Sequence, residues 1–163
     1  MTIHLLYGPV GSGKTTFARL LERDRNAVRF SPDEWMCSLY GQNPPAERFQ
    51  DNLEHIVALI WQIVARLVEL DVDVVLDSGF WTRRSRDEAR ERARQLGAAA
   101  QLYQLTCSEA EMRRRVLART ATMPPGALWI NEAAIDLFRL RLEPLGPDED
   151  HIVINSEDVI AVS

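Results

Sequence analysis

The sequence predicts an α/β fold in which a five-stranded parallel sheet is covered by helices on both faces, as a three-layer sandwich. Two observations predict it. Short strand-like runs alternate along the chain with longer segments of helical periodicity, as in consecutive βαβ units. The strand-like runs are apolar at consecutive positions, as expected of strands buried on both faces. The 163 residues contain no repeat and no linker, so we expect a single domain over residues 1–163.

In the first half of the chain, a buried strand is followed by a glycine-rich turn and a helix whose Phe17, Leu20 and Leu21 share one face. The second strand leads into Ser31-Pro32-Asp33, where the proline suits the first position of a short helix. A turn-rich break then precedes the longest helix, along which apolar residues recur at helical spacing. The expected ranges are residues 3–7, 14–23, 27–30, 31–40 and 46–70.

In the second half, a third strand is apolar at consecutive positions. Thr82 can cap the helix that follows, and Gly97 can end it. After a fourth strand, Ser108 can cap another helix, which runs into a loop over residues 120–129. Asn131 can cap the last helix, which precedes the last strand. The expected ranges are residues 73–77, 83–96, 100–107, 109–119, 131–142 and 151–155.

Composition restricts the partners and the compartment. The net charge is −5, so the overall field does not attract long anionic polymers, which argues against a nucleic-acid partner. No apolar run reaches the roughly 18 residues of a membrane span, and the first residues lack the features of a signal peptide. Cys37 and Cys107 are too few for a disulfide framework or a zinc site. We therefore expect a cytoplasmic protein with reduced thiols and no membrane partner, and the oligomeric state stays open.

The glycine-rich turn is the most specific motif. Residues 8–15, Gly-Pro-Val-Gly-Ser-Gly-Lys-Thr, fit G-x-x-x-x-G-K-[ST] at every fixed position, between a strand and a helix. Such a phosphate-binding loop (P-loop) turns backbone N–H groups toward a phosphate at a helix N-terminus. The motif predicts an ATP site with Lys14 on the β- and γ-phosphates and the Thr15 hydroxyl on Mg²⁺. We expect nucleotide contacts from Gly8, Pro9, Val10, Gly11, Ser12, Gly13, Lys14, Thr15 and Thr16.

Asp77 ends the third strand and is placed as a Walker B acid, which holds Mg²⁺ directly or through water. The alternative is that Asp77 only accepts hydrogen bonds in the Ser78-Gly79 turn. A serine follows where motor-type ATPases usually have a glutamate. No Asn-Lys-x-Asp of guanine-specific GTPases and no Leu-Ser-Gly-Gly of transporter ATPases occurs. These absences favour a small kinase.

Asp33 lies just beyond the second strand, at the sheet edge that the P-loop shares. A carboxylate there can orient an acceptor hydroxyl and take its proton as the hydroxyl attacks the γ-phosphorus. The alternative is that Asp33 caps the following helix. Glu34 is the second candidate for the proton-accepting role.

Four arginines cluster late in the helix predicted over residues 109–119. A kinase needs cations that close over the transferring phosphoryl group. Arg119 is the first candidate because it lies at the expected hinge between helix and loop, and Arg115 is the second, one turn earlier on the same face. We expect a lid over about residues 119–130, and each arginine alone has a solvated surface position as its alternative. The cluster comprises Arg113, Arg114, Arg115 and Arg119.

The acceptor pocket is the least determined part of the site. Arg83 and Arg84 open the helix after Asp77 and either grip an anionic acceptor or belong to a charged helix surface with an Arg84–Glu88 ion pair. For the nearby Arg86, the surface position is the expectation. Two aromatic residues follow the candidate carboxylates and either line the acceptor pocket or pack in the core. They are Trp35 and Trp81.

These segments together resemble a group of small P-loop kinases. The group includes the zeta-toxin, chloramphenicol phosphotransferase and polynucleotide 5′-kinase branches and many chains described as AAA family ATPases. The resemblance covers nearly the whole chain and implies a nucleoside-kinase-like P-loop NTPase fold with a small lid. It implies Lys14 and Thr15 on the phosphates and Mg²⁺, and Asp33 as the acid that activates the acceptor. Its lid arginines match Arg119 and Arg115. The segments that carry it are residues 8–15, 31–35, 74–83, 113–119 and 143–145.

We therefore expect an ATP-dependent kinase that phosphorylates a hydroxyl of a small molecule. Two alternatives stay open: a nucleic-acid 5′-hydroxyl kinase, and a nucleotide-binding regulatory module with weak ATPase activity. The chain lacks the long insertions of zeta toxins and a phosphatase partner domain, so the resemblance does not identify the acceptor.

Overall fold

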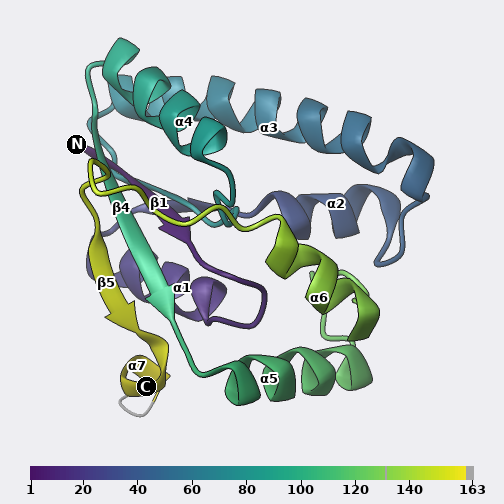
Figure 1. Ribbon diagram of the computed structural model, residues 1–163. Helices are drawn as coiled ribbons and strands as arrows, with labels where there is room; N and C mark the ends of the chain where they lie inside the picture. Colours follow the sequence, from purple (N-terminus) through teal and green to yellow (C-terminus); the bar gives the residue numbers. More distant parts are fainter. Residues whose placement is uncertain (131, 161–163) are drawn as a thin grey trace.

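The computed structural model describes residues 1–130 and 132–160. It confirms the predicted fold class: five strands form one sheet, every adjacent pair is parallel, and helices lie on both faces (Figure 1). The strands are β1 (Thr2–Tyr7), β2 (Val28–Phe30), β3 (Val74–Leu76), β4 (Ala99–Thr106) and β5 (Ile152–Asn155). The helices are α1 (Lys14–Asp24), α2 (Pro32–Tyr40), α3 (Ala46–Glu69), α4 (Arg83–Gln95), α5 (Glu109–Thr122), α6 (Glu132–Leu140) and α7 (Ser156–Ile160).

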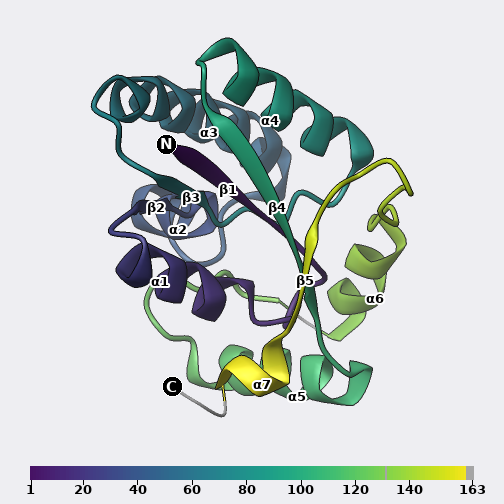
Figure 2. The ribbon, with the colours of Figure 1, turned by 90° about the vertical axis from the view of Figure 1, so that its left-hand side faces the viewer.

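The sheet separates two layers of helices. Its strand order is β2-β3-β1-β4-β5, with α3 and α4 over one face and α1 and α7 on the other (Figure 2). Successive residues of β1 alternate between the layers: Ile3 and Leu5 pack toward α3 and α4, and Leu6 packs toward α1. This two-sided burial explains why the strands are apolar at consecutive positions.

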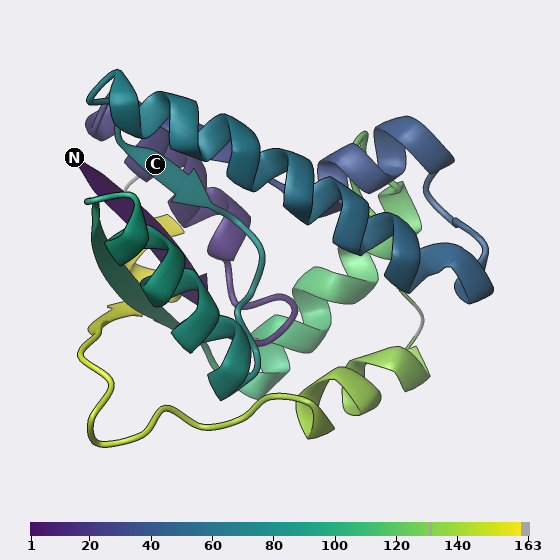
Figure 3. The same cartoon turned by 90° about the horizontal axis from the view of Figure 1, so that it is seen from above.

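The functional edge of the sheet is its carboxyl end, where all parallel strands stop together. Seen from above, the loop between β1 and α1 lies against α5 and α6 (Figure 3). The long helix α3 anchors the far layer through Ile56, Ile60 and Val64, which are four residues apart and almost fully buried. Each such side chain contributes roughly 1.5–3 kcal/mol by leaving water. Among the described residues, no helix combines the length and the apolar character that crossing a bilayer requires.

Two helix ends differ from the sequence-based expectation. Helix α5 continues to Thr122, one turn beyond the predicted end at Arg119, because Pro124 restricts only the residue before it and Met123 ends the helix at φ 41°. The hinge therefore lies at Met123. Ser108 occupies the N-cap position of α5 but makes no capping side-chain bond. Its backbone N–H donates to the carboxylate of Glu157 (2.9 Å).

Helix α7 was not predicted, although the sequence carries a signal for it. The Asn155 side chain accepts a hydrogen bond from the N–H of Glu157 (3.2 Å), and acidic residues occupy the first turn. The predicted cap Thr82 is confirmed, because its hydroxyl accepts from the N–H of Ser85, and α2 is capped in the same way by Ser31, which was not predicted as a cap. The predicted cap Asn131 lies outside the described residues.

Arg86 contradicts the expectation of a surface arginine on α4. Its side chain is fully buried and forms a paired contact with the carboxylate of Glu149, with N···O distances of 2.7 and 2.8 Å. The guanidinium also donates to the backbone carbonyls of Trp81 and Glu143 and lies 5.1 Å from the centroid of the Tyr7 ring. The arginine therefore fastens the segment between α6 and β5 to α4. The expected Arg84–Glu88 pair does form, at the surface (2.7 Å).

We predict that Glu149→Gln will lower the free energy of unfolding by about 3–5 kcal/mol, because the buried guanidinium of Arg86 loses its counter-charge. Urea unfolding followed by circular dichroism at pH 7 measures the loss. Glu88→Gln, which breaks an exposed ion pair of the same helix, is the matched control and should leave stability almost unchanged. Equal stabilities of Glu149→Gln and the wild type would refute a stabilising role for the buried pair.

The same pair predicts a pH dependence. Hydrogen bonds from Arg86 lower the pKa of Glu149 to about 2, from an ordinary value of 4.5. The carboxylate's contribution is therefore fully present above about pH 4.5 and is lost as the pH falls toward 2. The stability difference between wild type and Glu149→Gln should shrink over that interval, and a constant difference would contradict the assignment.

Candidate active site

The P-loop, residues 8–15, is built on close contacts that admit only glycine. Gly11 and Gly13 have φ angles of 82° and 89°. A methyl group at Gly11 would lie 2.5 Å from the carbonyl oxygen of Met112 in α5, and one at Gly13 would lie 2.9 Å from Cβ of Ser156 in α7. No side chain caps α1 and its first turn holds no acidic residue, so no side chain of the helix competes for the N–H groups at its N-terminus. Such an arrangement suits a phosphate.

Lys14 spans this loop. Its ammonium group donates to the carbonyl oxygens of Gly8 (2.8 Å) and Pro9 (2.7 Å). Burial lowers the pKa of Lys14 to about 8, although the negative charges of Asp77 and Asp33 act in the opposite direction. The lysine is thus held at the loop with a proton that it binds less tightly than an exposed lysine does.

Asp77 lies buried at the end of β3, beside the P-loop. It accepts a hydrogen bond from the Thr15 hydroxyl, and its carboxylate is 3.2 Å from the guanidinium of Arg29. Burial raises the pKa of Asp77, while Lys14, Thr15 and Arg29 lower it. Hydroxyl and carboxylate oxygens are ligands that Mg²⁺ accepts together with phosphate oxygens and water. The predicted metal residues, Thr15 and Asp77, are therefore brought together.

Arg29 was missed by the sequence reasoning. It lies in the three-residue strand β2 and pairs with Asp77 and with Glu34, whose carboxylate is 2.8 Å away. The available signal was a charged residue between the apolar residues of a short strand. Because Glu34 also pairs with Arg19 (3.3 Å), it is held in an ion-pair network. The network is a poor setting for the proton-accepting role for which Glu34 was the second candidate.

Asp33, by contrast, is an exposed carboxylate with no hydrogen bond or ion pair among the described residues. The cap of α2 is Ser31, so the capping alternative for Asp33 does not hold. Desolvation by the surrounding protein and the charge of Asp77 raise the pKa of Asp33, whereas Lys14 and Arg119 lower it. Asp33 therefore lies within electrostatic reach of the P-loop lysine and remains available to a ligand.

The four clustered arginines separate in the structure. Arg114 is an exposed partner of Glu111 (2.6 Å), and Arg113 pairs with Asp136 of α6 (3.1 Å). Arg115 bonds to Glu111 (2.7 Å) and to the Ser156 hydroxyl (3.0 Å), which places it beside Gly13.

Arg119 is the member of the cluster that faces the site. Its charge acts on both Lys14 and Asp33. Its Nε atom is buried without a hydrogen-bond partner in the described structure. Arg119 can therefore donate to an anion that arrives between the P-loop and α2.

The predicted acceptor residues are not all brought together. The Trp81 indole donates to the carbonyl oxygen of Gly8 (3.0 Å), so this residue borders the P-loop. Trp35 packs against Phe30 in the main core (ring centroids 6.0 Å apart). Arg83 pairs with Asp87 and Asp148, and Arg84 pairs with Glu88. The two arginines are thus engaged in ion pairs on α4, without a contact to the P-loop.

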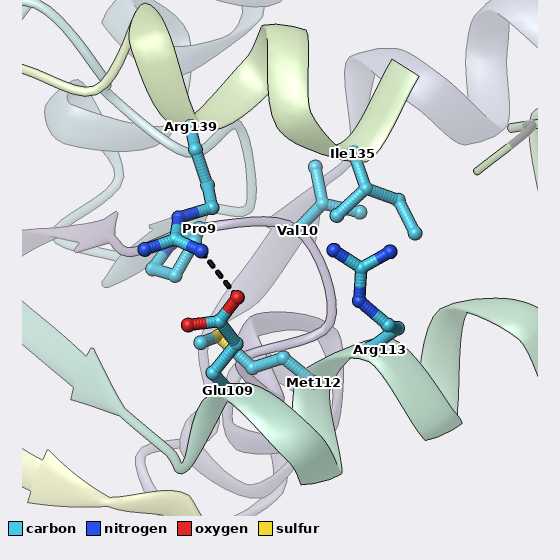
Figure 4. A pocket seen from close by; sticks show the side chains of 7 residues that line it. All are labelled: Pro9, Val10, Glu109, Met112, Arg113, Ile135 and Arg139. Carbon is cyan, nitrogen blue, oxygen red and sulfur yellow. Dashed lines mark hydrogen bonds and ion pairs between the residues drawn. The ribbon is translucent and has the colours of Figure 1, made fainter. Parts of the chain in front are cut away.

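A second face of the P-loop is covered by the two helices that flank the lid. Figure 4 shows Pro9 and Val10 in a small pocket between α6 and α5, where Arg139 pairs with Glu109. Ile135 and Met112 supply the apolar side of the pocket. With the Arg113–Asp136 pair, this contact holds α6 on α5 above the P-loop.

Comparisons with known proteins agree with this geometry. A family model described as an AAA domain matches residues 3–145. No curated protein is significantly similar in sequence. The fold resembles Kti12 from Chaetomium thermophilum in complex with ADP-AlF3 (17% identity, TM-score 0.74, 96% of this chain and 90% of that chain). It also resembles a gluconokinase from Sinorhizobium meliloti 1021 (18%, TM-score 0.65, 94% and 82%). A chain of the Pnkp1/Rnl/Hen1 RNA repair complex is a third likeness (22%, TM-score 0.69, 86% and 43%). At these identities the likeness shows a fold shared with P-loop kinases.

We predict that MgATP binding at pH 8 will be accompanied by uptake of about half a proton, because a Lys14 with a pKa of about 8 is half neutral there and gains a proton beside the triphosphate. Titration calorimetry in two buffers of different ionisation enthalpy measures the uptake. At pH 6 the wild type should take up none through this group. Lys14→Ala should bind more weakly and show no uptake at pH 8, and an unchanged uptake in that variant would refute the assignment.

Proposed function

This chain belongs to the AAA-domain family, and we propose that it is an ATP-dependent phosphotransferase that moves the γ-phosphate of ATP to a hydroxyl of a small-molecule acceptor. The observation that carries the proposal is the arrangement of two carboxylates with different surroundings. Asp77 is buried against Thr15 and Arg29, and Asp33 is exposed and without a partner among the described residues. Motor-type ATPases usually have a second carboxylate directly after the Walker B acid, whereas here Ser78 follows Asp77 and the second carboxylate lies on α2.

In the proposed reaction, the acceptor oxygen attacks the γ-phosphorus, and the bond between this phosphorus and the β,γ-bridging oxygen breaks, so that ADP leaves. The proton of the acceptor hydroxyl passes to the carboxylate of Asp33. A carboxylate whose pKa is raised is a better proton acceptor than an ordinary one, which supports this role. The reaction then ends with a phosphorylated acceptor, ADP and a proton that Asp33 returns to solvent.

Three other groups fit the demands of phosphoryl transfer. Lys14 would hold the β- and γ-phosphates, and Arg119 would stabilise the charge of the moving phosphoryl group. Thr15 and Asp77 would hold Mg²⁺, which screens the phosphate charge when bound. Arg115, the second lid candidate, lies at Gly13 and is bound to Glu111 and Ser156, so the transfer role falls on Arg119.

We predict that Asp33→Asn will lower the single-turnover rate of phosphoryl transfer by about 10²–10⁴-fold, because the amide keeps the shape of the side chain but cannot take a proton. ATP affinity should barely change, since the role is exercised only when the acceptor attacks. Until an acceptor is known, ATP hydrolysis with water as the acceptor is the assay. The matched control is Asp24→Asn. Asp24 is the last residue of α1, at the end of that helix away from the P-loop, and its carboxylate is exposed beside Arg23.

Two results would overturn this assignment. If Glu34→Gln removes activity while Asp33→Asn keeps it, the wrong carboxylate has been chosen. If neither substitution changes the rate although ATP binds, the chain is a nucleotide-binding module rather than a kinase.

We predict a separate effect for Arg119→Ala, which removes a cation near the P-loop that forms no ion pair with the residues that the structure describes. The transfer rate should fall ~10³-fold, as for other arginines that stabilise a transferring phosphoryl group. Arg114→Ala, which removes an exposed arginine from the same helix, should leave the rate unchanged. A loss below about tenfold for Arg119→Ala would exclude that residue from the transition state.

A further inference from the structure

A groove runs between α2 and the lid loop, which we define as residues 123–130. It is open to solvent and has a volume of about 250 Å³, slightly below the roughly 300 Å³ at which pockets for drug-sized ligands begin, so it has room only for a small molecule. The side chains at its surface are small or neutral, and none carries a charge. The lining residues are Cys37, Ser38, Gln42, Met123, Pro125 and Gly126.

The groove adjoins the proposed proton acceptor. Cys37 follows Asp33 by one turn of α2, so the two side chains share a face of the helix. The charges of Asp33 and Arg119 both act on the Cys37 thiol, which places them near the inner end of the groove. A molecule in the groove can therefore present a hydroxyl to Asp33.

The lid loop is fastened across this groove. The side-chain amide of Gln42 donates to the carbonyl oxygens of Met123 (3.3 Å) and Pro124 (3.0 Å). The backbone N–H of Trp129 donates to the carbonyl oxygen of Gln42 (3.0 Å), so both ends of the loop are bonded to one residue. Near the inner end, a methyl group at Gly126 would lie 3.0 Å from Cγ of Glu34. A long polymer would have to break these contacts to pass through.

The electrostatic surroundings of the groove do not favour an anion. Burial raises the pKa of the Cys37 thiol, and the charges of Asp33 and Glu34 raise it further, while Arg119 opposes them more weakly. The other arginine nearby, Arg29, is taken up by Asp77 and Glu34. The lining itself carries no cation, so once Arg119 binds the phosphoryl group neither of these two arginines is left for an anionic acceptor.

We propose that this groove is the acceptor subsite and that it takes a small alcohol without an anionic group near the reacting hydroxyl. The inference rests on the proposed function and makes it more specific. Sugar phosphates and nucleic acids with a 5′-hydroxyl end fall outside the class. In both, the sugar that bears the reacting hydroxyl also carries a phosphate group.

The thiol in the groove provides a test that requires no turnover. In a Cys107→Ser variant, Cys37 is the remaining thiol of the chain. We would measure, by mass spectrometry, its rates of alkylation by neutral iodoacetamide and by anionic iodoacetate. The iodoacetamide rate divided by the iodoacetate rate should be about threefold higher in the folded protein than in the same chain in urea. A factor of this size is the effect of one unit charge at roughly 7 Å in water. A ratio equal to or below the unfolded value would overturn the proposal.

Protection experiments separate the acceptor classes. With MgADP bound, neither glycerol 3-phosphate nor a single-stranded 5′-hydroxyl oligonucleotide should slow the alkylation of Cys37 by iodoacetamide. Protection by either probe would show that the groove accepts anions and would overturn the proposal. The proposed function is tested separately by the transfer rate of Asp33→Asn. A kinase with an anionic acceptor would show protection of Cys37, against this proposal, and would still lose activity in Asp33→Asn.

Discussion

Backbone packing at the P-loop is the constraint on which the rest of the site depends. Three of its glycines touch three different elements: Gly8 lies against Leu105 of β4, Gly11 against Met112 of α5, and Gly13 against Ser156 of α7. Because there is no room for a side chain at these contacts, the end of β4 and both helices are placed relative to the loop by backbone geometry. That placement sets where α5 begins, and α5 in turn carries Arg119 toward Lys14 and Asp33.

Charge around this loop is distributed in an ordered way. Arg29 neutralises Asp77 and Glu34, and Arg115 is bound to Glu111, so these cations are occupied in the absence of ligand. Asp33 and the Nε atom of Arg119 lack such partners in the described part of the chain. The carboxylate of Asp33 and the guanidinium of Arg119 can therefore both form new hydrogen bonds near the P-loop. This arrangement suits a reaction that moves both a proton and an anionic group.

The fold was predictable because its signals are local. The P-loop motif, the cap Thr82 and the apolar strands all lie within short windows of sequence. The residues that were missed act over long sequence separations: Arg29 reaches Asp77 across 48 positions, and Arg86 reaches Glu149 across 63. No helical periodicity distinguishes such arginines from surface ones. Arg119 was chosen from the sequence for its place near the end of the helix, whereas its unpartnered Nε atom could be seen only in the structure.

The buried pair of Arg86 and Glu149 has a consequence for how such a chain can diversify. It fixes the segment between α6 and β5 to α4. The neighbouring Trp81 donates to the carbonyl oxygen of Gly8, so this segment and the start of the P-loop are connected through α4 and the residues just before it. The lid loop, in contrast, is held by hydrogen bonds with Gln42 and Thr120 and by the packing of Leu128 against the main core. Substitutions at the lid-loop positions that line the groove can therefore change the shape of the groove without touching the buried pair of Arg86 and Glu149.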